Sequence, residues 1–160
     1  MYKQEELGLG FIAAYLRNQG YPVEVRAYAA DKFDLMMIDK IKPDMVGAVV
    51  YDANKTAVLD IYARIRSINE TVMLCVGGHC PTLSPALILQ ESENVDVVVV
   101  GEGEKTFTEL AESLFAGLPL SQVKGIVFRS SDGIVHTESR PVFSEMREVP
   151  FPSRDLLDQF

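Results

Sequence analysis

Two glycine-bearing turns, each preceded by a run of β-branched residues and followed by a helix-like segment, constrain the fold of this chain most strongly. The turns are Val76-Gly77-Gly78-His79-Cys80-Pro81 and Val100-Gly101-Glu102-Gly103-Glu104-Lys105-Thr106. Loops that follow parallel strands gather at the carboxyl edge of the sheet, and glycine lets a ligand approach the backbone closely. The two turns therefore predict a wide crevice at one sheet edge that accepts a large, flat ligand.

Apolar runs alternate with segments of helical periodicity along most of the chain. The apolar runs lack regular polar alternation, which is typical of parallel strands buried on both faces. The pattern predicts helices over 7–18, 34–41, 55–68 and 106–115, a short helix after Ser84-Pro85, and strands over 23–28, 45–51, 72–76 and 95–100. This order predicts the α/β class, with a doubly wound, Rossmann-like or flavodoxin-like parallel sheet.

The length and the last third of the chain define the domain organisation. With 160 residues, 48% of them hydrophobic, the chain can form one packed domain and a tail. Two β-rich stretches flank Ser131-Asp132-Gly133 and predict an antiparallel hairpin at the sheet edge, and Pro141, Pro150 and Pro152 indicate an extended arm or linker. We therefore expect an α/β body over 1–120, an edge hairpin of the same domain over 121–140, and a linker over 141–160.

The order of the first elements is unusual for such a sheet. A doubly wound sheet normally opens with a strand that becomes central, whereas this chain starts with about six polar-rich residues and then a helix. One strand is therefore expected to be missing. The sequence is interpreted as a fragment cut inside its first βα unit. The alternatives are a partner segment that fills the gap, with a strand-swapped homodimer as one form of it, or a rearranged sheet.

Composition excludes some classes of partner. The net charge is −8 and the basic residues are scattered, which argues against nucleic acid as a partner. No apolar run approaches the roughly 20 residues that cross a bilayer, so we expect no membrane partner and a cytoplasmic protein. Cys75 and Cys80 are the two cysteines, and both are expected to be reduced, with a disulfide as the minority alternative.

Several segments, taken in order, resemble one family. They are Leu7-Gly8-Leu9-Gly10-Phe11-Ile12-Ala13-Ala14-Tyr15-Leu16, Pro43-Asp44-Met45-Val46-Gly47, Val76-Gly77-Gly78-His79, the stretch from Val95 to Phe107, Gly125-Ile126-Val127-Phe128-Arg129, and Pro150-Phe151-Pro152-Ser153-Arg154-Asp155-Leu156-Leu157. Together they resemble the cobalamin-binding domain that precedes the catalytic barrel in cobalamin-dependent radical S-adenosylmethionine (SAM) enzymes of the tetrapyrrole cyclase and radical methyltransferase type. The likeness covers nearly the whole chain, and the Gly-Glu-Gly-Glu turn is its most specific part.

The resemblance implies a corrin over the carboxyl ends of the strands and a nucleotide tail between sheet and helices. Small and hydrogen-bonding side chains suit this ligand, because its rim is mostly neutral amides and it carries one phosphate. The cofactor-binding residues expected at this edge are Tyr51, Asp52, Ala53, Asn54, Thr56, Gly77, Gly78, His79, Gly101, Glu102, Gly103 and Thr106. The body over 1–120 would then be the cobalamin-binding domain.

Two departures from cobalamin and radical SAM motifs restrict the chemistry. The Asp-x-His-x-x-Gly loop that supplies a lower axial histidine in methionine synthase and the mutases is absent, and His79 lies on the wrong loop to replace it. Two cysteines cannot supply the three ligands of a 4Fe-4S cluster. No catalytic or metal-ligating residue is therefore assigned, and the cluster and SAM are expected only in a radical SAM barrel beyond Phe160.

Other interpretations of the same residues remain open. Gly77 and Gly78 can simply end a strand, and Glu102 and Glu104 can be charges that a helix N-terminus favours. Asp52 and Lys105 allow a phosphorelay receiver, but that fold needs an acidic pair after a first strand. The 101–106 turn lacks the glycine that precedes the lysine of a P-loop and the third glycine of a dinucleotide fingerprint.

The sequence therefore predicts a cobalamin-binding domain whose parent enzyme performs radical methyl transfer or oxidative cyclisation. The domain would present the upper face of the cofactor to the barrel. The alternative is a scaffold or interaction domain of a radical SAM protein that has lost cobalamin, with Val49, Val50 and Tyr51 filling the cleft. A third hypothesis, an independent nucleotide-binding enzyme, lacks every phosphate loop that can be recognised.

Overall fold

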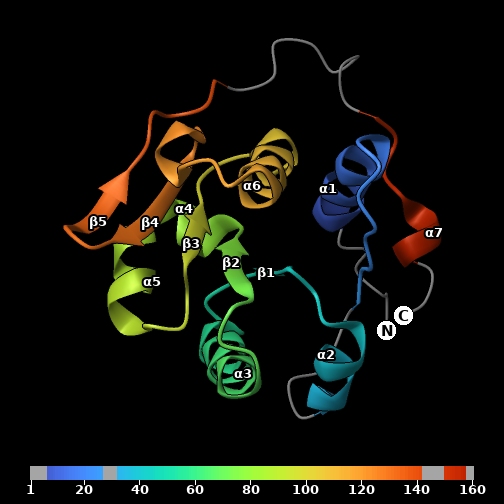
Figure 1. Ribbon diagram of the computed structural model, residues 1–160, viewed down its shortest axis with the longest axis horizontal. Helices are drawn as coiled ribbons and strands as arrows, with labels where there is room; N and C mark the ends of the chain where they lie inside the picture. The colour runs from blue at the N-terminus through green and yellow to red at the C-terminus, as the bar shows by residue number, and fades with distance from the viewer. Residues whose placement is uncertain (1–6, 27–31, 142–149, 158–160) are drawn as a thin grey trace.

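A five-stranded sheet of order β1-β2-β3-β4-β5 forms the centre of the protein (Figure 1). The computed structural model describes residues 7–26, 32–141 and 150–157. The strands are β1 (Met45–Val49), β2 (Met73–Gly77), β3 (Val97–Val99), β4 (Ile126–Ser130) and β5 (Gly133–His136). The first three are parallel, whereas β4 and β5 run antiparallel to their neighbours. The predicted α/β class and the edge hairpin are confirmed. The strands β2 and β3 are buried as expected, whereas β1, at the end of the sheet, is only half-buried and its Gly47 is exposed.

Helices cover both faces of this sheet. They are α1 (Leu7–Asn18), α2 (Leu35–Ile41), α3 (Lys55–Ile68), α4 (His79–Leu83), α5 (Pro85–Glu91), α6 (Glu104–Ala116), the 3-10 helix η2 (Leu120–Gln122) and α7 (Arg154–Leu157). The Asp34 side chain caps α2 by accepting a 2.9 Å hydrogen bond from the Met36 amide, and Pro85 occupies the first turn of α5. Residues 79–81, predicted as part of a glycine turn, belong instead to the short helix α4.

The hydrophobic core has two halves, one on each face of the sheet. On one face, α2, α3 and α5 pack against the strands through Ile38, Tyr62, Ile65, Ile88, Leu89, Leu74, Val76 and Val98. On the other, α6 packs through Phe107 and Leu110, joined by Ile12 of α1. Burial on both faces is the physical reason why β2 and β3 are apolar throughout.

The prediction of a strand over 23–28 is wrong for the part that can be described. Residues 23–26 adopt no regular secondary structure, while 27 and 28 lie outside the described residues. Arg26 instead forms a 2.7 Å ion pair with Glu24, two residues earlier in the chain. A β-branched pattern forms a strand only where a neighbouring strand accepts its hydrogen bonds, and no described strand lies beside this segment.

Strand β1 lies at one end of the sheet. Just outside the two ends of β1, the Asp44 carbonyl accepts from the Met73 amide and the Val50 amide donates to the Gly77 carbonyl. Backbone groups alternate along a strand, so Val46 and Ala48 also face β2, whereas Met45, Gly47 and Val49 direct their backbone groups away from it. Within the described ranges, these groups have no strand partner.

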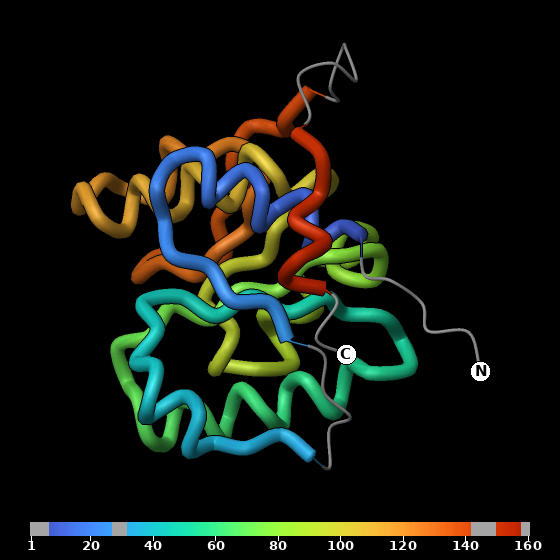
Figure 2. Tube along the Cα trace, turned by 90° about the vertical axis from the view of Figure 1, so that its right-hand side faces the viewer, coloured from blue at the N-terminus to red at the C-terminus, as the bar shows by residue number. Residues whose placement is uncertain are grey.

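The C-terminal segment returns to the N-terminal helix. The Ser153 amide donates a 3.0 Å hydrogen bond to the Gly10 carbonyl, and Arg17 pairs with Asp155 at 2.8 Å. Both views show α7 beside α1 (Figures 1 and 2). The expected extended linker therefore includes a helical turn that packs on the domain, although 142–149 lie outside the described residues. No described helix is long and apolar enough to cross a membrane.

Candidate functional site

Three loops meet at the carboxyl ends of β1, β2 and β3. Each loop leads into a helix N-terminus, that of α3, α4 or α6 (Figure 1). The Val50 amide donates a 2.8 Å hydrogen bond to the Gly77 carbonyl, and the Gly101 amide donates one of 3.1 Å to Thr82 Oγ1. The first bond joins the first loop to the end of β2, where the second loop begins, and the second bond joins the third loop to α4, which follows the second loop. The structure thus brings the two glycine turns together at one edge, as the sequence predicted.

The first loop is held by Asn54. Its Oδ1 accepts a 2.7 Å hydrogen bond from the Tyr51 amide, and its Nδ2 donates at 3.1 Å to the Val49 carbonyl. The polar atoms of Asn54 therefore shape the loop. Asp52, Ala53 and Thr56 are exposed, and Tyr51 is 44% exposed, so these side chains are the part of this loop that a ligand can reach.

The second loop packs tightly under the first. Gly77 is buried at the end of β2, and Gly78 has a φ of 105°. A Cβ at Gly78 would lie 3.0 Å from Val49 Cγ1 and 3.2 Å from the Val50 carbonyl oxygen. The close approach of two loops is therefore enough to require glycine at position 78, with no ligand involved. His79 follows as an exposed residue at the first turn of α4.

The third loop contains one open glycine and one covered glycine. Gly101 is exposed, has a φ of 80°, and has no atom within 4 Å of the position that a Cβ would take. At Gly103, by contrast, a Cβ would lie 2.8 Å from Ile12 Cδ1, because α1 covers this residue. The backbone at Gly101, with exposed Glu102 beside it, is thus the accessible part of this turn.

Thr106 lies behind the third loop. Its side chain is fully buried, and its hydroxyl lies 3.3 Å from the Glu102 carbonyl oxygen and 3.5 Å from that of Lys124. The same hydroxyl accepts a 2.9 Å hydrogen bond from Arg140 Nε. Sequence reasoning missed Arg140 altogether, because no motif contains it and it lies far along the chain from Thr106.

The charged and titratable groups at this edge are mostly paired. Lys55, at the start of α3, forms a 2.7 Å ion pair with Glu91 of α5. Burial raises the pKa of the Cys80 thiol, and its hydrogen bond with Asp52 raises that pKa further. Burial also raises the pKa of Glu104, whose Oε2 is buried without a hydrogen-bond partner in the described part of the chain. The edge therefore carries little unpaired positive charge and one buried acceptor that lacks a donor.

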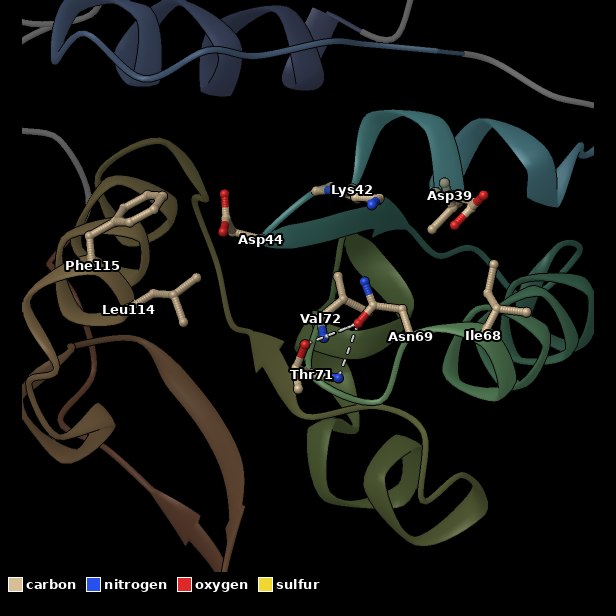
Figure 3. A pocket seen from close by; sticks show the side chains of 11 residues that line it. Asp39, Lys42, Asp44, Ile68, Asn69, Thr71, Val72, Leu114 and Phe115 are labelled. Atoms are coloured by element: carbon tan, nitrogen blue, oxygen red, sulfur yellow. Dashed lines mark hydrogen bonds between the residues drawn. The ribbon is translucent and has the colours of Figure 1, made fainter.

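A cavity of about 540 Å³ lies at the other end of the strands and is not part of this site. In Figure 3, Asp39 and Lys42 lie across from Leu114 and Phe115, with Asp44 and Val72 between them. Asn69 Oδ1 accepts hydrogen bonds of 3.1 Å from the amides of Thr71 and Val72. These polar atoms stabilise the turn before β2, so the cavity is left without an assigned ligand.

Comparisons with known proteins agree with this arrangement. A family model described as the B12 binding domain matches residues 2–111. An uncharacterized methyltransferase, PH0819 of Pyrococcus horikoshii, is 34% identical over 158 residues, covering 94% of this chain and 34% of that protein. The anaerobic magnesium-protoporphyrin IX monomethyl ester cyclase of Rubrivivax gelatinosus is 26% identical over 155 residues, covering 88% of this chain and 27% of that protein.

A solved structure extends the likeness to three dimensions. The cobalamin-dependent S-adenosylmethionine radical enzyme OxsB, with aqua-cobalamin and S-adenosylmethionine bound, superposes with a TM-score of 0.82 at 26% identity. The match covers 95% of this chain and 22% of that one, and the chain spans about a third or less of the length of each relative named here. The chain therefore belongs to the B12-binding domain family, and its relatives include cobalamin-dependent radical SAM enzymes.

Proposed function

We propose that this chain binds cobalamin at the carboxyl edge of β1, β2 and β3. The observation that carries the proposal is the open backbone at Gly101, which is exposed, has a φ of 80° and lies on the third loop at the carboxyl edge of the sheet of a B12-binding domain. A large ring with a polar rim can approach such a backbone closely, because no side chain stands in the way. The family match supports the ligand, and the geometry supports its place.

The residues at this edge suit the chemistry of a cobalamin rim. The rim carries mostly neutral amides, which donate and accept hydrogen bonds but need no cationic partner. Asp52, Thr56 and Glu102 are exposed at this edge, and their side-chain oxygens can accept hydrogen bonds from such amides. The ion pair of Lys55 with Glu91 keeps one cation at this edge neutralised. The residues present therefore fit the group.

The site residues divide into two roles in this proposal. Tyr51, Asp52, Ala53, Thr56, His79, Gly101 and Glu102 are exposed and would contact the cofactor. Asn54, Gly77, Gly78, Gly103 and Thr106 hold the loops in place through the contacts described above. When bound, cobalamin supplies a cobalt centre that can carry a methyl group or exchange electrons.

We further propose that the chain is the cobalamin-binding domain of a radical SAM enzyme. In this proposal residues 1–120 bind the cofactor, 121–140 form the edge hairpin and 141–160 lead toward a barrel that holds the 4Fe-4S cluster and SAM. The names of the relatives support radical methyl transfer or oxidative cyclisation as the parent reaction, since one is a methyltransferase and another a cyclase. The chain by itself would bind and present the cofactor.

The first test is retention of cobalamin by the purified chain. The protein is mixed with hydroxocobalamin in the dark and desalted, and the visible spectrum of the protein fraction is recorded. We expect about one equivalent of corrin per chain, as for a single pre-formed site. If a folded protein retains no corrin, the proposal is contradicted and the cobalamin-free scaffold is supported.

A pair of glycine variants tests the location of the site. Gly101→Asn adds a side chain where the ligand is proposed to approach, and asparagine tolerates a positive φ better than most residues. Gly117→Asn is the matched control, because Gly117 has a φ of 65° and equally open surroundings at the far end of α6. We expect Gly101→Asn to lose cobalamin and Gly117→Asn to retain it. Equal retention would place the cofactor elsewhere.

A further inference from the structure

Arg140 connects the segment that follows the hairpin to the third loop of the site. Its side chain is only 14% exposed. Nε donates a 2.9 Å hydrogen bond to Thr106 Oγ1, and Nη2 donates to the Glu109 carboxylate and, at 3.2 Å, to the Lys124 carbonyl oxygen. A guanidinium that is almost buried and has three partners is held in one orientation.

Thr106 passes this restraint to the loop. Because its hydroxyl accepts from Arg140, the hydroxyl proton is left to donate, and the Glu102 carbonyl oxygen lies 3.3 Å away. Glu102 follows Gly101, the open glycine of the site. The chain of contacts therefore runs from Arg140 through Thr106 to the backbone that the proposed ligand would approach.

The surrounding backbone leaves Arg140 little freedom to move. Gly125 has a φ of 76°, and a Cβ there would lie 3.3 Å from Arg140 Cβ and 3.4 Å from Thr106 Oγ1. The Gly125 amide donates a 2.8 Å hydrogen bond to the Glu138 carbonyl oxygen, and its own carbonyl accepts from the Val100 amide at 2.9 Å. Because Gly125 has no side chain, residues 138–140 pack closely against it, next to the end of β3.

We propose that Arg140 is a positioning residue that holds the Gly101–Gly103 loop in its ligand-accepting conformation, acting through the hydroxyl of Thr106. Arg140 itself does not contact the ligand. Because it immediately precedes Pro141, it also couples the loop to the segment through which the chain leaves the hairpin. The effect of Arg140 on cobalamin rests on the proposed function, whereas its effect on the loop does not.

Hydrogen exchange of the cobalamin-free protein tests the loop directly. Two amides report on it: Gly101, which donates to Thr82 Oγ1, and Phe107, which donates to the Gly103 carbonyl at 2.7 Å. We expect Arg140→Ala to accelerate exchange at both amides about tenfold, the scale of a lost charge-assisted hydrogen bond. Lys124→Ala is the matched control, since it removes the exposed ion pair with Glu138 on the same segment and leaves the contacts to Thr106 intact.

Cobalamin affinity is the second readout. We expect Arg140→Ala to weaken cobalamin binding about tenfold and Lys124→Ala to change it less than about twofold. Equal values for the two variants in both readouts would overturn the proposal. A wild-type chain that binds no cobalamin contradicts the proposed function alone, because the exchange measurement still decides the role of Arg140.

Variants of Thr106 keep the proposal testable if Arg140→Ala does not fold. Thr106→Val removes the hydroxyl and keeps the branched shape, whereas Thr106→Ser keeps the hydroxyl. We expect fast loop exchange in Thr106→Val and near wild-type exchange in Thr106→Ser. Where Arg140→Ala folds, adding Thr106→Val should change the amide exchange rates of the loop little, because Arg140 acts on the loop through the Thr106 hydroxyl. Additive effects, or fast exchange in both Thr106 variants, would contradict it.

Discussion

At the scale of single residues, the glycines of the site differ in why they are glycines. Gly78 is required by its positive φ, the Val49 side chain and the Val50 backbone, whereas Gly103 is covered by the Ile12 side chain of α1. Gly101 has nothing within 4 Å of the position that a side chain would take, so its backbone is accessible. The sequence shows all of them as members of glycine-rich turns, and only the packing separates the structural glycines from the accessible one.

Glu104 provides a prediction at the same scale. Burial raises its pKa in the folded protein above the ordinary value of 4.5. The carboxylate form therefore destabilises the fold at pH 7. This penalty fades as the pH falls through the raised pKa of the folded protein, and it is gone below 4.5, where the unfolded chain is protonated as well. We expect Glu104→Gln to be more stable than the wild type at pH 7, with the difference shrinking toward zero near about pH 4.

Urea unfolding at the two pH values measures this difference. Glu112→Gln is a suitable control, because Glu112 is an exposed residue of the same helix. The control should differ little from the wild type at either pH. A Glu104→Gln variant that is no more stable than the wild type at pH 7 would show that the buried carboxylate has found a donor in the folded protein.

At the scale of elements, the connections around β1 indicate where a further strand belongs. Helices α2 and α3 pack on one face of the sheet, whereas α1 and α6 pack on the other. A right-handed crossover through α2, on the same face as α3, would place a strand before α2 on the free side of β1. A right-handed crossover through α1, on the opposite face, would place a strand before α1 between that position and β1. Residues 23–26 form no strand and have no strand beside them among the described residues.

Amide exchange along β1 tests the free edge. In the 160-residue chain, we expect fast exchange at Met45, Gly47 and Val49, whose amides face away from β2, and slow exchange at Val46 and Ala48. Alternating rates measured by NMR at low protein concentration would confirm an open edge. Protection of the outward amides that appears only at high concentration would indicate a strand-paired homodimer, and protection at every concentration would contradict the open edge.

At the scale of the whole molecule, two distant segments return to the domain. Residues 150–157 pack on α1, and residues 138–140 pack on the start of α6. Figure 2 shows the C-terminal segment beside α1, so residues from the two ends of the sequence share one surface. The proposed linker is therefore anchored on the domain on both sides of 142–149.

Gly10 allows a test of this anchoring. A Cβ at Gly10 would lie 2.9 Å from Leu157 Cδ1 and 3.0 Å from Pro152 Cβ, whereas one at Gly8 would meet nothing within 4 Å. We expect Gly10→Val to expose the Ser153 amide to solvent exchange and Gly8→Val to leave it protected. Retained protection in Gly10→Val would show that the tail adjusts without leaving α1.

The sequence alone determined the features that depend on neighbouring residues and on apolar periodicity. Continuous runs such as Val97–Val99 specify buried parallel strands, because only a sheet covered on both faces can bury every side chain. Helical spacing predicted α3 over its full length and α2 to within one residue. The glycine turns directly follow strands, and this order along the chain is sufficient to place them at one edge of the sheet.

Tertiary structure alone decided what depends on residues far apart in the chain. Whether a glycine is open to a ligand or filled by a neighbour depends on α1, as Gly103 and Ile12 show. Thr106 is buried and accepts a hydrogen bond from the distant Arg140, and residues 23–26 lie outside the sheet with no described strand beside them. Local sequence specifies backbone preference and periodicity, whereas contacts, burial and strand pairing are decided by which distant segments the folded chain brings together.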